Sequence, residues 1–343
     1  MPWPGPARGG REDAMSTRIL VLATGGTIAG QADNSASARY VAGELGIDQL
    51  LASVGDFSRH ATIAAEQIAN IGSEDMSGPI WGKLLQRIGD AFENDTADAV
   101  IVTHGTDTIE ETAFLLDLAL PAGRPVVLVA AMRPANALGA DGPRNLANAI
   151  RLAADPGSPR RGVMVVLGDF AYAARDVSKA TTVNVEAFRG FPHGPIAQVQ
   201  PSALRFLTAG GEAAWRGRYA FPHHGQLPPV AILHAHANMD DPSVHAMLSC
   251  GLAGVVLAGL GHGNAPKQVY QALASASAAG LMVVRASQVG EGAAPHGMEI
   301  DDKALGFIAG SVLSPRKCRI LLQMLLANGI RAHAECQRVF DQF

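Results

Sequence analysis

The chain has 343 residues, a length that favours two domains over a single hydrophobic core. Apolar residues make up 48% of it and charged residues only 17%, which is typical of a folded α/β enzyme and excludes a disordered or fibrous chain. The formal net charge of -4 supplies no basic surface for phosphates, so neither nucleic acid nor a membrane is expected as a partner.

The N-terminal segment 1–16 is rich in proline and glycine and lacks the apolar core that a signal peptide requires. We expect it to be a disordered tail, with Met1 or Met15 as the true start, and the protein to be cytoplasmic. No apolar run in the chain approaches the roughly 20 residues of a membrane-spanning helix.

Short apolar runs alternate with helical patterns from Arg18 to about Leu167, which predicts a parallel sheet covered by helices in an N-terminal domain of residues 17–207. Helices are expected to begin at Ser77 and Asp141, each followed two residues later by proline. A third helix is expected at Thr108, which has the spacing of a capping box with Glu111. Four runs are apolar throughout and fit strands buried on both faces: 19–22, 99–102, 126–129 and 163–166.

The periodicity is lost between residues 208 and 228, where glycine and proline are frequent, and we interpret this stretch as a linker. A smaller series follows in 229–343, ending in a helix that starts at Ser314 and Pro315. Its expected strands are 230–233, 254–257 and 281–284. The sequence therefore predicts two α/β domains without an internal repeat. Three cysteines fit neither a zinc site nor a disulfide framework and are expected to be reduced and structural: Cys250, Cys318 and Cys336.

The loop that leaves the first strand, 24–30, carries paired glycines between Thr24 and Thr27. Glycines let the backbone turn tightly and approach a ligand, and open parallel sheets bind ligands at the carboxyl ends of their strands. The loop matches neither the phosphate-binding P-loop nor the dinucleotide fingerprint, and alone it also fits a plain turn. The small polar residues that follow, up to Tyr40, fit either an exposed loop or a mobile lid over a substrate.

Two further loops carry polar side chains to the same edge of the expected sheet. In 70–76, Ser73 either caps the next helix or receives a carboxylate together with nearby backbone N–H groups. In 102–108, Thr106 and Asp107 follow a wholly apolar strand and are expected to project towards the first loop. The carboxylate of Asp107 either pairs with a substrate ammonium group or serves as a charge in the first turn of the helix.

These loops belong to a series of motifs that runs along the chain from Arg18 onwards. The motifs are 24–30, 70–76, 104–112, 131–134, 142–143, 175–179, 261–264 and 299–302. In this order they resemble the bacterial-type L-asparaginase family, which includes the glutaminase-asparaginases. The resemblance implies a larger N-terminal domain with a mostly parallel, flavodoxin-like sheet and a smaller C-terminal α/β domain. It also implies hydrolysis of L-asparagine to L-aspartate and ammonia through an acyl-enzyme.

The resemblance assigns catalytic roles to five residues, beginning with Thr27 as the nucleophile and Tyr40 as the lid residue that orients or deprotonates it. Thr106, Asp107 and Lys179 form a second polar cluster behind the substrate amide. Threonine is a poor nucleophile at neutral pH unless a neighbour takes its proton, and Lys179 beside Thr106 fits such a relay. Backbone N–H groups around Thr106 are candidates to stabilise the oxyanion. The spacing leaves open which threonine acts first.

The resemblance also assigns the substrate-binding residues. Ser73 holds the α-carboxylate of the substrate, and Asp107 with Glu74 holds its α-ammonium group. Asn264 and Glu299, from the smaller domain, reach across an intimate dimer interface into a neighbouring subunit's site. The implied assembly is a homotetramer built from two such dimers.

Glu74 stands where many members of the family carry glutamine and others glutamate, a variation that bears on substrate preference and not on the presence of activity. Asparagine and glutamine differ by one methylene, which a pocket discriminates by only about 1–3 kcal/mol. We therefore expect asparaginase activity with some glutaminase activity, the alternative being a glutaminase-asparaginase of broad specificity.

Other classes of protein fit the sequence less well. An asparaginase-like subunit of a tRNA-dependent amidotransferase would carry an added N-terminal module, and a nucleotide-binding α/β module would carry a Walker lysine. No metal or cofactor is expected. Four histidines that invite assignment as metal ligands lack an accompanying set of carboxylates or cysteines: His223, His224, His234 and His236.

Overall fold

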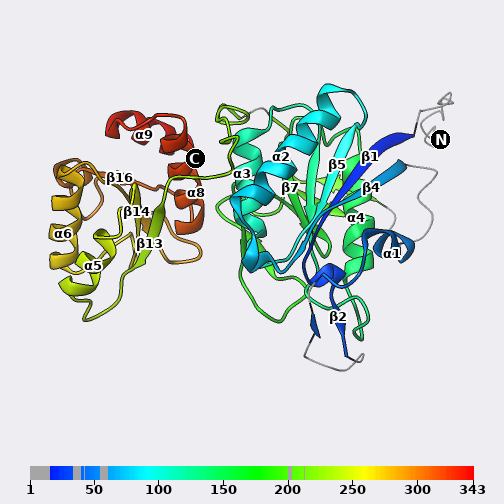
Figure 1. Ribbon diagram of the computed structural model, residues 1–343, viewed down its shortest axis with the longest axis horizontal. Coiled ribbons are helices and arrows are strands. Elements are labelled where there is room, and N and C mark those ends of the chain that lie inside the picture. The colour runs from blue at the N-terminus through cyan, green and yellow to red at the C-terminus, as the bar shows by residue number, and fades with distance from the viewer. Residues whose placement is uncertain (1–15, 34–39, 42, 55–60, 200–202, 212) are drawn as a thin grey trace, which may run out of the picture.

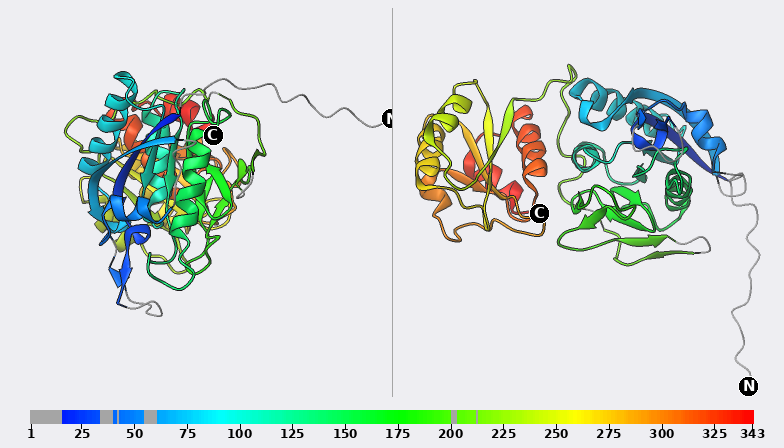
Figure 2. Two further views of the ribbon diagram at one scale, coloured as in Figure 1. Left: turned by 90° about the vertical axis from the view of Figure 1, so that its right-hand side faces the viewer. Right: turned by 90° about the horizontal axis from the view of Figure 1, so that it is seen from below.

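The computed structural model describes residues 16–33, 40–41, 43–54, 61–199, 203–211 and 213–343. Two α/β lobes lie side by side, the larger built from the N-terminal part of the chain and the smaller from the C-terminal part (Figures 1 and 2). The expectation of two α/β domains of unequal size is confirmed. The expected tail, 1–16, lies outside the described residues except at Ser16.

An eight-stranded sheet forms the larger lobe, in the order β12-β11-β8-β7-β6-β5-β1-β4. The strands are β1 (Thr17–Gly25), β4 (Ala61–Ile71), β5 (Ala99–Thr103), β6 (Val126–Val129), β7 (Val163–Leu167), β8 (Phe170–Ala173), β11 (Ala197–Val199) and β12 (Leu204–Phe206). From β4 to β7 the pairing is parallel, and by chain order these five strands run 2-1-3-4-5, the flavodoxin-like arrangement. The strands β8, β11 and β12 extend the sheet in antiparallel fashion.

Helices cover both faces of this sheet because alternate side chains of each strand point to opposite sides. Leu20 and Leu22 of β1 belong to one core, with residues of α2 and α3, whereas Ile19 and Val21 belong to the other, with residues of α1 and α4. The helices are α1 (Ile47–Ala52), α2 (Gly78–Glu93), α3 (Ile109–Ala119) and α4 (Gly142–Ala154). All four predicted buried strands and the three predicted helix starts are present.

The capping box predicted at the start of α3 is wrong. Thr108 occupies the N-cap position, but its hydroxyl donates to the carbonyl of Ser73 at 2.7 Å instead of capping the helix. Glu111 accepts a hydrogen bond from the guanidinium of Arg319 at 2.6 Å. Both side chains therefore form hydrogen bonds with residues that are distant in sequence. The spacing of Thr108 and Glu111 along the chain does not reveal these partners.

The smaller lobe contains a four-stranded parallel sheet in the order β13-β14-β15-β16. Its strands are β13 (Val230–His234), β14 (Gly254–Gly259), β15 (Met282–Ser287) and β16 (Phe307–Ala309), and its helices are α5 (Asp241–Leu248), α6 (Lys267–Ala278), α7 (Asp302–Leu305), α8 (Pro315–Ala327) and α9 (His333–Phe340). The Ser314 hydroxyl accepts the N–H of Lys317, so α8 is capped where the sequence predicted its start.

The two lobes share one hydrophobic core, because α8 packs against α3 and contributes leucines to the cluster that contains α2 and α3. The described residues between β12 and β13 form no helix or strand, yet the segment is anchored. Arg216 donates to the buried carboxylate of Asp117 at 3.0 Å, and Trp215 donates to its other oxygen. The packing of α8 on α3 thus joins the two lobes, and the segment between them is held against the larger lobe.

The cysteines are free thiols, with Cys318 and Cys336 buried and Cys250 exposed. Burial raises the pKa of the Cys336 thiol to about 11, so it stays protonated at neutral pH. Within the described part of the chain, no helix is both long and apolar enough to cross a membrane.

Candidate active site

Three loops meet at the carboxyl edge of β1, β4 and β5, which are adjacent and parallel. The N–H of Gly26 donates to the carbonyl of Ile71 at 2.8 Å, which ties the first loop to the second. Gly26 has a φ of 80°, and a Cβ there would lie 2.5 Å from the backbone nitrogen of Gly105. Only glycine permits this approach, so the paired glycines bring the first loop onto the third.

The second and third loops are joined through Ser73, which is buried in the short 3₁₀ helix η2 (Ser73–Asp75). Its hydroxyl accepts the N–H of Asp107 at 3.2 Å, while its carbonyl accepts the hydroxyl of Thr108. A Cβ at Gly105 would lie 2.7 Å from the Ser73 hydroxyl oxygen, so glycine is again required by the contact. The backbone between Gly105 and Thr108 is thereby fixed against Ser73.

Lys179 completes a polar cluster with the third loop. It lies in β9 (Val177–Lys179), which pairs with β10 (Phe188–Gly190), far along the chain from Thr106. Its Nζ donates to Thr106 Oγ1 at 2.8 Å and to Asp107 Oδ1 at 2.6 Å. An amine, a hydroxyl and a carboxylate therefore meet at this point. The lysine side chain is 16% exposed and the aspartate side chain 61%, so a solute can reach the carboxylate.

Thr27 directly follows Gly26 and lies, buried, in the short 3₁₀ helix η1 (Thr27–Ala29). The chain then forms a hairpin of β2 (Gln31–Ala32) and β3 (Tyr40–Val41), which projects from the larger lobe (Figure 1). Residues 34–39, the centre of the expected lid, and the side chain of Tyr40 lie outside the described part of the structure.

Glu74 is exposed in η2, next to the buried Ser73, and its carboxylate lies against Gly72. The structure thus brings Ser73, Thr106, Asp107 and Lys179 together by direct contacts and places Glu74 beside Ser73.

His104 is a site residue to which the sequence patterns assigned no role. It is fully buried at the end of β5; its Nδ1 donates to the carbonyl of Gly105 at 2.8 Å, and its Nε2 accepts the hydroxyl of Thr112 at 2.9 Å. This tautomer follows from the partners, because a carbonyl only accepts and Thr112 already receives the indole N–H of Trp81. Burial lowers the pKa of His104 to about 4, so the ring is neutral at physiological pH and holds the Gly105 carbonyl in place.

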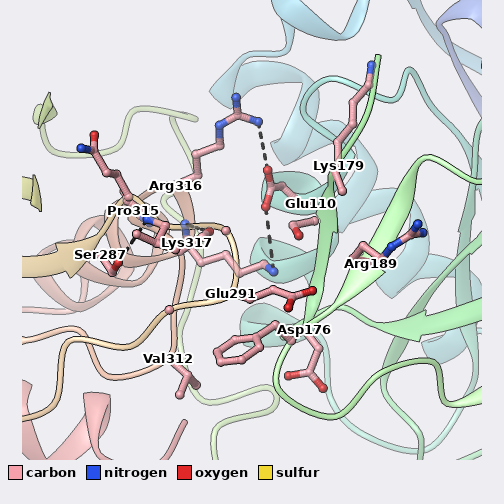
Figure 3. A pocket seen from close by; sticks show the side chains of 18 of the residues that line it. Glu110, Asp176, Lys179, Arg189, Ser287, Glu291, Val312, Pro315, Arg316 and Lys317 are labelled. Carbon is pink, nitrogen blue, oxygen red and sulfur yellow. Dashed lines mark hydrogen bonds and ion pairs between the residues drawn. The ribbon is translucent and has the colours of Figure 1, made fainter. Parts of the chain in front are cut away.

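The smaller lobe touches the third loop through α8. The Arg316 guanidinium donates to the carbonyl of Asp107 at 3.1 Å and to Glu110 at 2.9 Å. Glu110 lies between Arg316 and the buried amine of Lys317, whose pKa is lowered by burial (Figure 3). A cavity of about 310 Å³ lies here between the lobes, and of the expected site residues it is lined by Lys179 alone.

Asn264 and Glu299 lie together in the smaller lobe, where the Asn264 amide donates to one carboxylate oxygen of Glu299. Among the described residues, no hydrogen bond or ion pair joins either of them to Ser73, Thr106, Asp107 or Lys179 of the same chain. In the same described ranges, no group of three histidine, cysteine, aspartate or glutamate side chains is arranged to hold a metal ion.

Comparison with known proteins identifies both halves of the chain. The family model described as Asparaginase, N-terminal, matches residues 18–209, and that of the Glutaminase/Asparaginase C-terminal domain matches residues 229–340. L-asparaginase 2 of Escherichia coli is 38% identical over 326 residues, covering 95% of this chain and 93% of that protein. The glutaminase-asparaginase of Pseudomonas fluorescens is 33% identical, with 95% and 90% covered. The crystal structure of a probable cytoplasmic L-asparaginase from Campylobacter jejuni superposes with a TM-score of 0.90 at 36% identity and covers 96% of this chain and 100% of its own.

Proposed function

Because the chain belongs to the asparaginase family, an amidohydrolase family, we propose that it hydrolyses L-asparagine to L-aspartate and ammonia with Thr27 as the nucleophile. The observation that carries the proposal is the cluster of Lys179, Thr106 and Asp107, joined at 2.8 and 2.6 Å beside the loop that bears Thr27. Sequence relatives named for asparagine or for both amides support the substrate class.

In the first half of the proposed reaction, the Thr27 oxygen attacks the side-chain amide carbon and its proton passes to the relay. A C–O bond forms, the C–N bond breaks, and the nitrogen takes a proton and leaves as ammonia. The contact between Lys179 Nζ and Thr106 Oγ1 gives a path along which a proton moves. Backbone N–H groups around Thr106 stabilise the oxyanion of the tetrahedral intermediate. His104 and Ser73 fix this stretch of backbone through the Gly105 carbonyl and the Asp107 N–H.

In the second half, water attacks the aspartyl ester on Thr27, L-aspartate leaves and the threonine hydroxyl is restored. We assign the activation of this water to the same Lys179 and Thr106 pair, whose hydrogen bond provides the proton path. Tyr40, from the hairpin that carries the expected lid, orients the nucleophile and helps to exclude bulk water.

The same proposal assigns substrate binding to the second and third loops. Ser73 and nearby backbone N–H groups receive the α-carboxylate, because N–H and O–H groups donate to an anion. Asp107 receives the α-ammonium through the oxygen that Lys179 leaves open, and Glu74 adds a second carboxylate from the exposed side.

We also propose that Asn264 and Glu299 act in a neighbouring subunit's site, within a homotetramer built as a dimer of intimate dimers. Two observations support a contact there: the pair has no partner in its own chain's cluster among the described residues, and exposed apolar side chains flank it. Leu260 and Met298 are 40% and 43% exposed, next to the loops that carry Asn264 and Glu299.

Two further assignments accompany this proposal. We propose that the protein acts in the cytoplasm, as does, by its description, the probable cytoplasmic enzyme of Campylobacter jejuni. We also propose domain limits of 17–207 and 229–343 with a linker at 208–228, and the limits of the two matched family models support them.

The experiment that tests the proposed activity compares steady-state hydrolysis of L-asparagine, L-glutamine and their D-isomers by the purified protein. We expect stoichiometric L-aspartate and ammonia from L-asparagine. We expect kcat/KM for L-glutamine to be lower by about tenfold or more, the effect of one methylene in a fitted pocket. Equal or faster turnover of glutamine would establish broad specificity instead, and a failure to release ammonia from either amide would refute the proposed function.

A further inference from the structure

The carboxylate of Glu299 is held by two side chains of a different loop. His262 Nδ1 lies 3.0 Å from its Oε1, and the Asn264 amide donates to its Oε2. The Glu299 side chain is nevertheless 47% exposed, and a carboxylate can accept more hydrogen bonds than these two. The backbone at Glu299 has a φ of 64°, an unusual conformation for a residue with a side chain, which fixes where that side chain leaves the loop.

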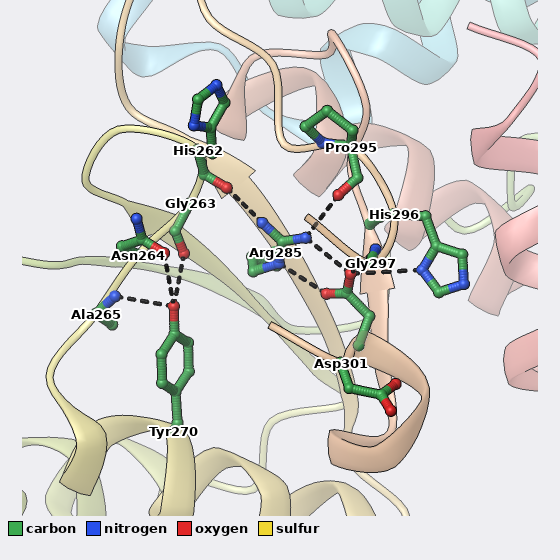
Figure 4. Close-up of polar contacts among 12 residues, drawn as sticks. His262, Gly263, Asn264, Ala265, Tyr270, Arg285, Pro295, His296, Gly297 and Asp301 are labelled. Carbon is green, nitrogen blue, oxygen red and sulfur yellow. Dashed lines mark hydrogen bonds and ion pairs between the residues drawn. The ribbon is translucent and has the colours of Figure 1, made fainter. Parts of the chain in front are cut away.

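The two loops that meet at Glu299 are locked to each other by one buried guanidinium (Figure 4). Arg285 donates to the carbonyl of His262 in one loop and to the carbonyl of Pro295 in the other. It also forms two hydrogen bonds of 2.7 Å with the buried carboxylate of Asp302. The position of the His262 backbone relative to the Glu299 loop is therefore set by the core of the smaller lobe, not by the surface contact itself.

The electrostatics favour a charged Glu299. Hydrogen bonds from Asn264 first, and from His262 second, lower the pKa of the Glu299 carboxyl below its usual range. A carboxylate that is exposed, ionised and fixed in direction by two donors suits a fixed cationic partner such as an ammonium group. Asn264 belongs to the expected site, whereas His262 has no role in the proposed function.

We propose that His262 is a positioning residue, which holds the Glu299 carboxylate in the direction needed to contact, in addition to Asp107 of that site, the α-ammonium group of an amino acid bound in a neighbouring subunit. This inference rests on the proposed function, including the action of Glu299 across the interface. His262 acts only through Glu299: its Nδ1–H donates to Oε1, and the ligand takes lone pairs that neither His262 nor Asn264 occupies.

The test measures inhibition of L-asparagine hydrolysis by L-aspartate and by succinate, which lacks the ammonium group. His262→Ala is expected to raise the inhibition constant for L-aspartate about fivefold, the effect of one lost hydrogen bond, and to leave that for succinate unchanged. In His262→Ala, the KM for L-asparagine is expected to rise by a larger factor than that by which kcat falls. His262→Asn restores the wild-type values, because the asparagine Nδ2 stands at the same distance along the side chain as the histidine Nδ1.

Two further variants control the test. His236→Ala removes another exposed histidine of the same lobe, whose Nδ1 contacts only the carbonyl of Ala237 among the described residues, and is expected to change nothing. Because Glu299→Ala is expected to be nearly inactive, its affinity for L-aspartate is measured directly by isothermal titration calorimetry. The dissociation constant is expected to rise above that of the wild type, and adding His262→Ala produces no further rise, since the two residues act as one unit.

The outcomes separate the inference from the function it rests on. An unchanged inhibition constant for L-aspartate in His262→Ala, with a raised dissociation constant for L-aspartate in Glu299→Ala, overturns the role of His262 while the proposed function stands. Equal rises for L-aspartate and succinate also overturn it, because they report general damage to the loop. If the wild-type protein releases no ammonia from L-asparagine, the proposed function itself fails and the inference falls with it.

Discussion

His104 has a neutral ring buried between the Gly105 carbonyl and the Thr112 hydroxyl, and this makes the protein sensitive to mild acid. Its pKa is lowered from 6.5 to about 4, so between these values the unfolded chain binds the proton and the folded chain does not. Stability therefore falls as the pH falls through this window, by at most about 1.4 kcal/mol per pH unit from this residue.

The variant His104→Asn tests this prediction by denaturant unfolding at several pH values between about 7.5 and 4, a range that spans the two pKa values. We expect it to be less stable than the wild type at neutral pH, because the Thr112 contact is lost, and to have a shallower pH dependence. Parallel pH dependences for the two proteins would contradict the assignment.

Single residues differ in how far the sequence alone could place them. Thr106 and Asp107 follow a wholly apolar strand, so their position at the sheet edge is predictable from the strand pattern. Lys179 lies 73 positions from Thr106, and only the motif to which it belongs, not the periodicity of the chain, predicted its place in the site. His104 opens the motif 104–112 but was assigned no role, because a histidine at the end of an apolar strand is equally consistent with a surface or a core position.

Among the structural elements, the contact of the first loop with the third depends on Gly26. Gly26→Ala would place a Cβ 2.5 Å from the Gly105 nitrogen at a φ of 80°, so the backbone of one loop must move. We expect a loss of about 1–3 kcal/mol of unfolding free energy, and a larger proportional loss of activity since Thr27 is adjacent.

Gly89→Ala is the matched control for that variant. Gly89 lies inside α2, and a Cβ there meets no atom within 4 Å, so alanine is expected to stabilise the helix by about 0.5–1 kcal/mol. Denaturant midpoints and ammonia release for both variants check the pair; an active, stable Gly26→Ala protein would show that the loops need no close approach.

Strands made of continuous apolar runs were predictable from the sequence. Three-residue strands, and a helix cap whose side chains bind partners distant in sequence, were not. The strands β5, β6 and β7 are four or five consecutive buried residues, which the sequence pattern states directly. The strands β11 and β12 have three residues each, too few for a period of two to appear. The capping box at Thr108 was wrong because Ser73 and Arg319, which compete for the two side chains, are supplied by tertiary packing.

For the whole molecule, the proposed sharing of sites between subunits predicts complementation. Thr27→Ala and Glu299→Ala proteins are each expected to be nearly inactive, yet a mixed dimer contains one native site and one doubly altered site. Random exchange at equal concentrations then restores about a quarter of wild-type activity, by the symmetry of the dimer.

A mixture of Thr27→Ala with Thr106→Ala is the control, since both residues belong to the same chain's cluster and no native site forms. Subunit exchange is verified by native mass spectrometry. Verified exchange without recovery in the first mixture would contradict a site shared between chains.

The proposed mechanism requires Thr27 to carry the acyl group, which rapid acid quenching during L-asparagine turnover, followed by peptide mapping, can locate. We expect an aspartyl ester on the peptide that contains Thr27, and no ester and almost no ammonia release in Thr27→Ala. An ester on the peptide that contains Thr106, or a Thr27→Ala protein that keeps most of its rate, would contradict this assignment.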